Sequence, residues 1–161
     1  MKMNNGKITI GNVCFLIDRS KNEILFLERS FEPMKNMLTG VGGKTKFDED
    51  INMSCLREIK EETGLNARDL KLKGVVKTIL EGSESSWILF IYTSEEFSGK
   101  QIDCPEGKLE WIGINEVNNL NLIGFIRELM PFVLNENSII EGTITHDITG
   151  KVLSKKIIEV K

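Results

Sequence analysis

The stretch from Asp50 to Thr63 has the pattern of a helix with one apolar side, and it constrains the fold more than any other segment. Ile51, Cys55 and Ile59 recur every four residues, which brings them to one helix face. Acidic residues just before the stretch put negative charge where the helix dipole favours it, and Gly64 can end the helix in a left-handed conformation. The chain therefore places a helix between a glycine-dense turn and Gly64.

Three carboxylates, those of Glu58, Glu61 and Glu62, fall on a second face of this helix. Like charges at this spacing cost about 0.2–0.5 kcal/mol per pair, and carboxylates in the last turn oppose the helix dipole by roughly 0.3–1 kcal/mol each. The arrangement has two interpretations. It is either a solvated acidic face or a set of hard oxygen ligands for Mg²⁺ or Mn²⁺, which proteins commonly share with substrate phosphates.

Most other periodic segments of the 161-residue chain are predicted to be strands, because they are rich in β-branched and aromatic side chains. A second helix is predicted over 122–134, where Pro131 is expected to bend or shorten it. Mixed strands with two helices favour an α+β fold or an α/β/α sandwich, in a single domain over residues 1–161. The predicted strands are 7–18, 23–28, 70–80, 87–93, 107–114, 139–145 and 152–160.

Composition excludes several functional classes. The formal net charge of −3 gives no bulk attraction for nucleic acid or acidic membranes. No apolar run approaches the roughly 18 residues of a membrane span, and the first residues lack the apolar core of a secretory signal. Cys14, Cys55 and Cys104 form no CxxC pair, which argues against a zinc site or a disulfide framework and favours a cytoplasmic location. His146 is the single histidine, and we expect it on the surface.

The spacing of charged residues around the first helix decides between its two interpretations. Five residues separate Gly43 from Glu49, and seven residues separate Glu49 from Arg57. Arg57 begins the segment Arg57–Leu65, which reads REIKEETGL. This pattern over residues 43–65 matches the Nudix box in full, so the chain resembles the Nudix hydrolase family. The resemblance implies an α/β fold, the Nudix α/β/α sandwich with a mixed β-sheet. It also implies hydrolysis of a nucleoside diphosphate linked to another group, with Mg²⁺ as cofactor and Mn²⁺ able to replace it.

The resemblance also implies a set of metal ligands, some of which supply the catalytic base. The segment Pro105–Trp111 is similar to a downstream segment of MutT-like enzymes, in which a glutamate before the tryptophan reaches the metal. Glu106 is the first choice for that role and Glu110 the second, and for each the alternative is a loop carboxylate in solvent. The implied ligands are Gly42, through its carbonyl group, Glu58, Glu61, Glu62 and Glu106.

Other positions of the box are expected to be structural or to contact phosphates. Glu49 and Arg57 are implied to form an ion pair that braces the loop against the helix, and Gly43 and Gly64 are the structural glycines. Lys44 stands where the family often places a phosphate-contacting lysine. Arg29, at the end of the second predicted strand, is a weaker candidate for the same contact.

The resemblance extends toward the oxidised-purine branch of the family. Residues 142–152 resemble the closing hairpin of 8-oxo-dGTP diphosphatases, but Leu38-Thr39 replaces the usual Trp-Asn pair, and residues 122–127 lack the usual base-reading aspartate. We therefore expect a nucleoside triphosphate to be cleaved to a monophosphate and pyrophosphate, with oxidised purine nucleotides as one candidate substrate. The alternatives are dinucleoside polyphosphates, nucleotide sugars, a capped RNA end disfavoured by the net charge, or a module that binds a nucleotide without cleaving it.

Aromatic residues are expected to divide between the core and the base site. Phe31 and Phe125 are candidates to flank a nucleobase, whereas Trp87 and Trp111 lie in predicted strands and are expected in the core. The sequence leaves the oligomeric state open.

Overall fold

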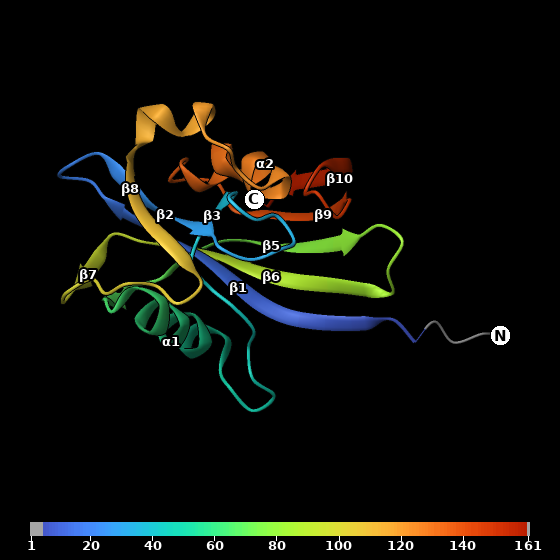
Figure 1. The fold of residues 1–161 in the computed structure, drawn as a ribbon, viewed down its shortest axis with the longest axis horizontal. Coiled ribbons are helices and arrows are strands. Elements are labelled where there is room, and N and C mark those ends of the chain that lie inside the picture. Colours follow the sequence, from blue (N-terminus) through green and yellow to red (C-terminus); the bar gives the residue numbers. More distant parts are fainter. Residues whose placement is uncertain (1–4, 161) are drawn as a thin grey trace.

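The computed structural model describes residues 5–160, and its main element is a mixed sheet of eight strands (Figure 1). The strands are β1 (Lys7–Asp18), β2 (Glu23–Arg29), β3 (Leu38–Thr39), β4 (Asn66–Arg68), β5 (Lys71–Leu80), β6 (Ser85–Ser94), β7 (Glu96–Ser98), β8 (Gly107–Gly113), β9 (Ile140–His146) and β10 (Val152–Glu159). The helices are α1 (Ile51–Thr63), a 3₁₀ helix (Ile114–Asn119) and α2 (Gly124–Val133). The sheet order is β10-β9-β5-β6-β1-β2-β3, β8 also pairs with β2, and β4 and β7 form a separate small sheet.

Two parallel pairings make the sheet mixed. β1 lies parallel to β6, and β5 lies parallel to β9, while the remaining neighbours are antiparallel. The first strand of the chain therefore sits in the middle of the sheet, and the last hairpin extends the edge beyond β5.

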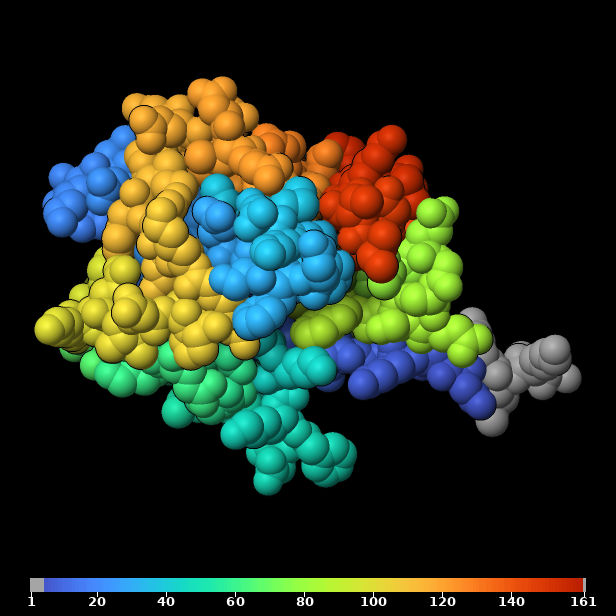
Figure 2. All heavy atoms as spheres, viewed as in Figure 1, coloured from blue at the N-terminus to red at the C-terminus, as the bar shows by residue number. Residues whose placement is uncertain are grey.

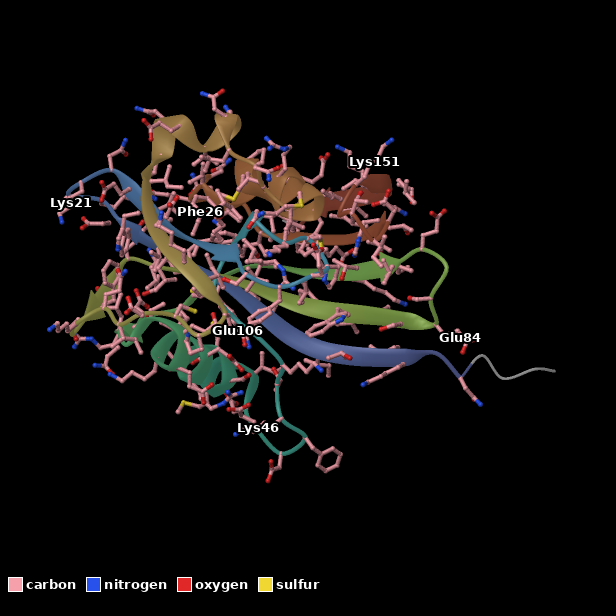
Figure 3. The ribbon with its side chains drawn as sticks, in the orientation of Figure 1. Lys21, Phe26, Lys46, Glu84, Glu106 and Lys151 are labelled. Atoms are coloured by element: carbon pink, nitrogen blue, oxygen red, sulfur yellow. The ribbon has the colours of Figure 1, made fainter. Side chains whose placement is uncertain are left out.

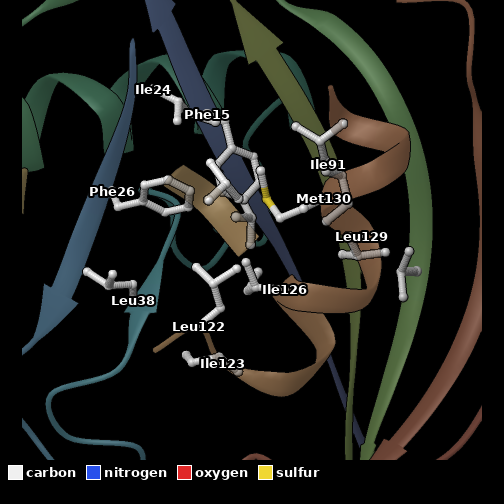
Figure 4. Packing of buried hydrophobic residues seen from close by; sticks show 14 of the residues in the cluster. Phe15, Ile24, Phe26, Leu38, Ile91, Leu122, Ile123, Ile126, Leu129 and Met130 are labelled. Carbon is white, nitrogen blue, oxygen red and sulfur yellow. The ribbon is translucent and has the colours of Figure 1, made fainter. Parts of the chain in front are cut away.

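The central strands are buried on both faces because their residues alternate between two cores. Along β1, Val13, Phe15 and Ile17 belong to the core that α2 covers, and Cys14 and Leu16 belong to the core that α1 covers. A strand buried on both sides requires a continuous apolar run, and residues 13–17 supply one. The two helices lie on opposite sides of the sheet (Figure 1), and Figure 4 shows the core on the α2 side. The predicted α/β/α sandwich with a mixed sheet is confirmed.

Both ends of α1 are formed by the residues that the sequence predicted. Asp50 is the N-cap, and its carboxylate accepts hydrogen bonds from the backbone N–H groups of Asn52 and Met53. Gly64 closes the helix with φ of 78°, a left-handed conformation that glycine adopts without strain, and its N–H donates to the carbonyl group of Lys60. The register of the glutamates along this helix is therefore fixed at both ends.

The predicted strands agree with the structure to within about two residues, but helix α2 begins later than predicted. Leu122 forms a parallel bridge with Leu38, and the N–H of Ile123 donates to the carbonyl group of Leu38, so both residues are engaged by β3 before the helix starts. Pro131 lies inside α2, which ends two residues later at Val133. No helix in residues 5–160 is long and apolar enough to span a membrane.

Candidate active site

A cavity of about 400 Å³ lies on the α2 side of the sheet. Its floor comes from strands β1, β5 and β6, which contribute Val13, Thr78 and Leu89. The segment after β2 and the end of β9 form its walls, and they meet where Met34 lies against Gly150. In Figure 2 the light blue atoms of the first segment adjoin the red atoms of the C-terminal hairpin. The cavity is large enough to hold a nucleobase and part of a sugar.

Glu62 reaches one end of this cavity from the last turn of α1. Glu62 is only 7% exposed, and its Oε2 accepts a 3.0 Å hydrogen bond from the backbone N–H of Gly42. Burial raises the pKa of the Glu62 carboxyl to about 8, and the charges of Glu58, Glu106 and Glu61 add to this against the opposing effect of the Gly42 bond. The sequence placed all three helix glutamates on a face separate from the apolar one, but Glu62 is buried alongside Ile59.

Arg57 forms hydrogen bonds with the other two helix glutamates and with Glu49. Its Nε and Nη2 atoms bond both carboxylate oxygens of Glu49 at 2.6 and 3.0 Å, and its Nη1 bonds Glu58 at 2.9 Å and Glu61 at 3.1 Å. This contact lowers the pKa of Glu49 to about 2, whereas burial raises the pKa of Glu58 in spite of Arg57. The side chain of Glu61 is 57% exposed and that of Glu58 is 15% exposed, so the three glutamates occupy three different environments.

Glu106 lines the same cavity as Glu62, and the end of the β2–β8 pairing positions it. The residue after it, Gly107, pairs with Arg29, and the carbonyl group of Glu106 accepts a hydrogen bond from the N–H of Ser30. In Figure 3, Glu106 lies where the start of β8 approaches α1. Glu110 instead forms a 2.6 Å ion pair with Lys108 and does not line the cavity. Of the two candidates, the structure therefore brings Glu106 to the helix glutamates.

One of the two candidate phosphate-binding residues lines the cavity, and the other lies beside a residue that lines it. Arg29 lines the cavity, with its Nε donating to the carbonyl group of Pro33. Lys44 is absent from the lining, but its Nζ lies 5.7 Å from the ring centre of Trp87, which does line it. Both cations therefore lie close to the cavity.

The donor set at this end of the cavity fits a hard divalent cation. Among residues 5–160 no three acidic, histidine or cysteine side chains already surround one point as a metal site, because Arg57 engages Glu58 and Glu61 while Glu62 turns to Gly42. Even so, burial raises the pKa values of Glu62 and Glu58, and the charges of neighbouring carboxylates raise both further. A bound Mg²⁺ or Mn²⁺ ion would relieve both effects, and carboxylate and carbonyl oxygens are the ligands these ions prefer.

Aromatic residues and the single histidine also line the cavity. Phe31 and Phe125 are among them, as expected for groups that flank a base, and Trp87 lines the cavity while packing against the core on the α2 side. The expectation that His146 lies on the surface is wrong: the residue is 7% exposed and lines the cavity, with its ring centre 5.6 Å from that of Phe125. The packing of α2 over β9 buries it, and a polar hairpin sequence carries no sign of that packing.

Sequence reasoning also missed Asn12, which lines the cavity beside Gly42. It is 2% exposed, its Nδ2 donates to Oγ of Ser54 on α1 at 3.1 Å, and its Oδ1 has no hydrogen-bond partner in the described part of the chain. The asparagine interrupts an otherwise apolar strand, and that interruption was the available signal. Thr78 and Leu80 were missed because nothing in a strand's sequence distinguishes a cavity floor from a filled core.

Comparisons with known proteins show the family. The family model of the NUDIX domain matches residues 9–132, which is most of the chain, and the chain belongs to the Nudix family. The chain is 26% identical over 143 residues to the uncharacterized Nudix hydrolase YvcI of Bacillus subtilis, covering 86% of this chain and 89% of that protein. It is 27% identical over 78 residues to the oxidized purine nucleoside triphosphate hydrolase of Danio rerio, covering 48% of this chain and 50% of that protein.

A solved structure gives the same classification. The MutT protein of Bacillus halodurans superimposes with a TM-score of 0.83 and 28% identity, covering 92% of this chain and 97% of that one. The protein is therefore a MutT-like Nudix hydrolase, an enzyme that cleaves pyrophosphate bonds. Nudix enzymes generally use a divalent metal and bind small nucleotide substrates.

Proposed function

We propose that this enzyme is a Mg²⁺-dependent pyrophosphohydrolase of nucleoside triphosphates, releasing a nucleoside monophosphate and pyrophosphate. The observation that supports this is the shared cavity, which is lined both by the carboxylate residues Glu62 and Glu106 and by Phe125, Trp87 and His146. A cavity that combines carboxylates with aromatic rings suits a molecule with a phosphate chain and a base. The complete Nudix box supports cleavage rather than binding alone.

In this proposal the ion is held by Glu58, Glu61, Glu62, Glu106 and the carbonyl group of Gly42. When bound, Mg²⁺ supplies charge neutralisation at the phosphate oxygens and lowers the pKa of a water molecule. Glu61 or Glu106 accepts the proton of the attacking water, and Lys44 and Arg29 bind the phosphate chain. The water oxygen forms a bond to one phosphorus, the bridging P–O bond breaks, and the leaving group, pyrophosphate or the nucleoside monophosphate, carries away the electron pair.

The base preference is proposed to include oxidised purines. The Danio rerio relative bears that activity in its name, although the alignment spans about half of each protein. Thr39 lines the cavity, and in residues 122–127 the cavity receives Ile123 and Phe125 rather than an acidic side chain. Recognition of the base must therefore use other polar groups than an aspartate at this helix. We further propose that residues 1–161 act as one domain in the cytoplasm, where the free thiols of Cys14, Cys55 and Cys104 would stay reduced.

A panel of nucleotides tests this function. Nucleotide products are separated by chromatography, and pyrophosphate release is measured in parallel, with Mg²⁺ for the common nucleoside triphosphates, 8-oxo-dGTP, a dinucleoside polyphosphate, ADP-ribose and a nucleotide sugar. We expect turnover of at least one triphosphate, abolished by EDTA and by Glu61→Gln. Turnover of only a dinucleotide or a nucleotide sugar would replace the proposed substrate class, and turnover of none would leave a nucleotide-binding module.

A further inference from the structure

His146 occupies a built position in the lining of the cavity. It is the last residue of β9, where it pairs with Leu80 of the neighbouring strand β5, and only 7% of its surface is exposed. Its ring packs against that of Phe125 at the start of α2, with centres 5.6 Å apart and planes inclined by 39°. The imidazole is therefore a polar group held between two elements, with one side facing the cavity.

The hydrogen bond of one ring nitrogen determines the role of the other. Nδ1 of His146 lies 2.8 Å from the backbone carbonyl oxygen of Asp147. A carbonyl oxygen can only accept, so Nδ1 carries the proton, and in the neutral ring Nε2 is then an acceptor. Nε2 makes no hydrogen bond to any other group in residues 5–160. The cavity thus receives an acceptor atom that no protein donor satisfies.

The turn that fixes this nitrogen is itself rigid. One carboxylate oxygen of Asp147 accepts hydrogen bonds from the backbone N–H groups of Thr149 and Lys151 and from the hydroxyl group of Thr149. The carbonyl oxygen that receives Nδ1–H of His146 also receives the N–H of Gly150 at 3.1 Å. Because this carbonyl group is held in place, the imidazole cannot turn its second nitrogen away from the cavity without losing its bond.

We propose that Nε2 of His146 is the specificity-determining acceptor for the nucleobase, selecting a base edge that presents an N–H donor beside the ring of Phe125. The inference rests on the proposed function, since it assigns the base end of the same cavity. The hydroxyl groups of Thr78 and Ser85 line this end as well, and they can adapt as donor or acceptor, whereas the imidazole nitrogen discriminates. A base without an N–H donor would shield this acceptor from solvent without satisfying it, which weakens binding and gives the selectivity.

Two substitutions separate the base contact from the turn contact. His146→Asn places an amide near the position of Nδ1 and keeps a donor for Asp147, but it loses the acceptor at Nε2. His146→Gln places an amide near Nε2 and keeps an acceptor there, but it loses the turn contact. Thr149→Ala weakens the turn and leaves the histidine intact, so it reports what a loosened hairpin does alone.

The test compares four purine nucleotides of matched size, with guanine, hypoxanthine, adenine or unsubstituted purine as the base. Unsubstituted purine has no N–H donor on its ring edge. Hydrolysis of the triphosphates is followed as kcat and KM, and binding of the corresponding monophosphates is measured by calorimetry. We expect the wild-type enzyme to bind its preferred donor-bearing base about tenfold more tightly than unsubstituted purine, with the difference in KM rather than kcat.

We expect His146→Asn to reduce that preference to less than about twofold, while His146→Gln and Thr149→Ala retain it. A wild-type enzyme that binds unsubstituted purine as tightly as the others overturns the inference, and so does a preference that survives in His146→Asn. Loss of the preference in Thr149→Ala would assign it to the turn and would also overturn the inference. Failure of every triphosphate in the wider nucleotide panel to be hydrolysed contradicts the proposed function instead, because binding of the monophosphates still reports the role of Nε2.

Discussion

The backbone N–H of Gly42 donates a 3.0 Å hydrogen bond to Oε2 of Glu62, joining the glycine turn to the last turn of α1. The bond gives a buried carboxylate one donor but no neutralising charge, and burial keeps its pKa raised to about 8. The candidate site therefore combines a fixed geometry with an unfavourable charge, which is the combination that a divalent cation stabilises.

Glu62→Gln is expected to lower kcat by about 10²–10⁴-fold, because it removes a proposed metal ligand while preserving size and the bond from Gly42. Folding stability should not fall, since the neutral amide is easier to bury than a carboxylate. Steady-state kinetics and thermal unfolding check both. The matched control is Glu84→Gln, which changes an exposed glutamate at the far end of the molecule (Figure 3). Activity equal to that of the control would remove Glu62 from the mechanism.

The stability of the metal-free enzyme should fall as the pH rises. The folded state keeps Glu62 protonated up to a pKa of about 8, whereas the unfolded chain releases that proton near the usual carboxyl pKa of about 4.3. The folded state therefore binds more protons between these values, and the free energy of unfolding decreases across this window by a few kcal/mol. Urea unfolding in EDTA at several pH values measures it. Glu62→Gln should flatten the profile, and an equally steep profile in this variant would assign the dependence to other groups.

Magnesium should reverse this loss of stability. A ligand that binds only the folded state stabilises it by about 2.7 kcal/mol at one hundred times its dissociation constant. Because the ion must displace the proton of Glu62, we expect its affinity to be higher at pH 8 than at pH 6. Calorimetric titration with MgCl₂ at the two pH values tests this. Affinity that is independent of pH would show that the ion does not contact the buried carboxylate.

Arg57→Lys should lower the melting temperature by several degrees and weaken activity. A lysine ammonium group cannot reproduce the two parallel bonds to Glu49 together with the bonds to Glu58 and Glu61. Arg19→Lys is the matched control, because Arg19 also contacts two carboxylates, those of Glu95 and Glu136, but its side chain is 41% exposed. Exposed pairs contribute little, so this control should melt close to the wild type. Equal shifts in the two variants would contradict a bracing role for Arg57.

Gly42→Ala should abolish activity and strongly destabilise the protein. A Cβ atom at this position would overlap the backbone carbonyl oxygen of Asn12, and the φ angle of 152° is one that other residues rarely adopt. Gly113→Ala is the comparison, because a Cβ there meets nothing closer than 3.5 Å. Thermal unfolding ranks the two variants. If Gly42→Ala melted within a degree or two of Gly113→Ala, the close packing of the glycine turn on β1 would be disproved.

Long elements could be predicted from the sequence because their burial leaves a local trace. β1 is apolar on both faces, and α1 carries its own N-cap and C-cap, so each pattern reports its environment. The short strands β3, β4 and β7 have two or three residues each and exist only through partners far along the chain, such as the pairing of Leu38 with Glu28. No local period can signal a strand of that length.

Some features of the candidate site could likewise be predicted from the sequence, and others could not. Spacing identified Glu58, Glu61 and Glu62 as a group, and the downstream motif selected Glu106 over Glu110 for the position that the structure brings beside them. The separate environments of the glutamates could not be predicted, since the burial of Glu62 depends on the loop that packs over it. The position of His146 could not be predicted either, because it depends on how α2 crosses β9.

The parallel pairing of β5 with β9 joins the last hairpin to the edge of the sheet. This hairpin is synthesised after the acidic helix and lies beyond residue 132, where the NUDIX family match ends. If His146 contacts the base as proposed, substitutions in this late edge of the sheet would change the choice of nucleotide while the helix glutamates stay unchanged.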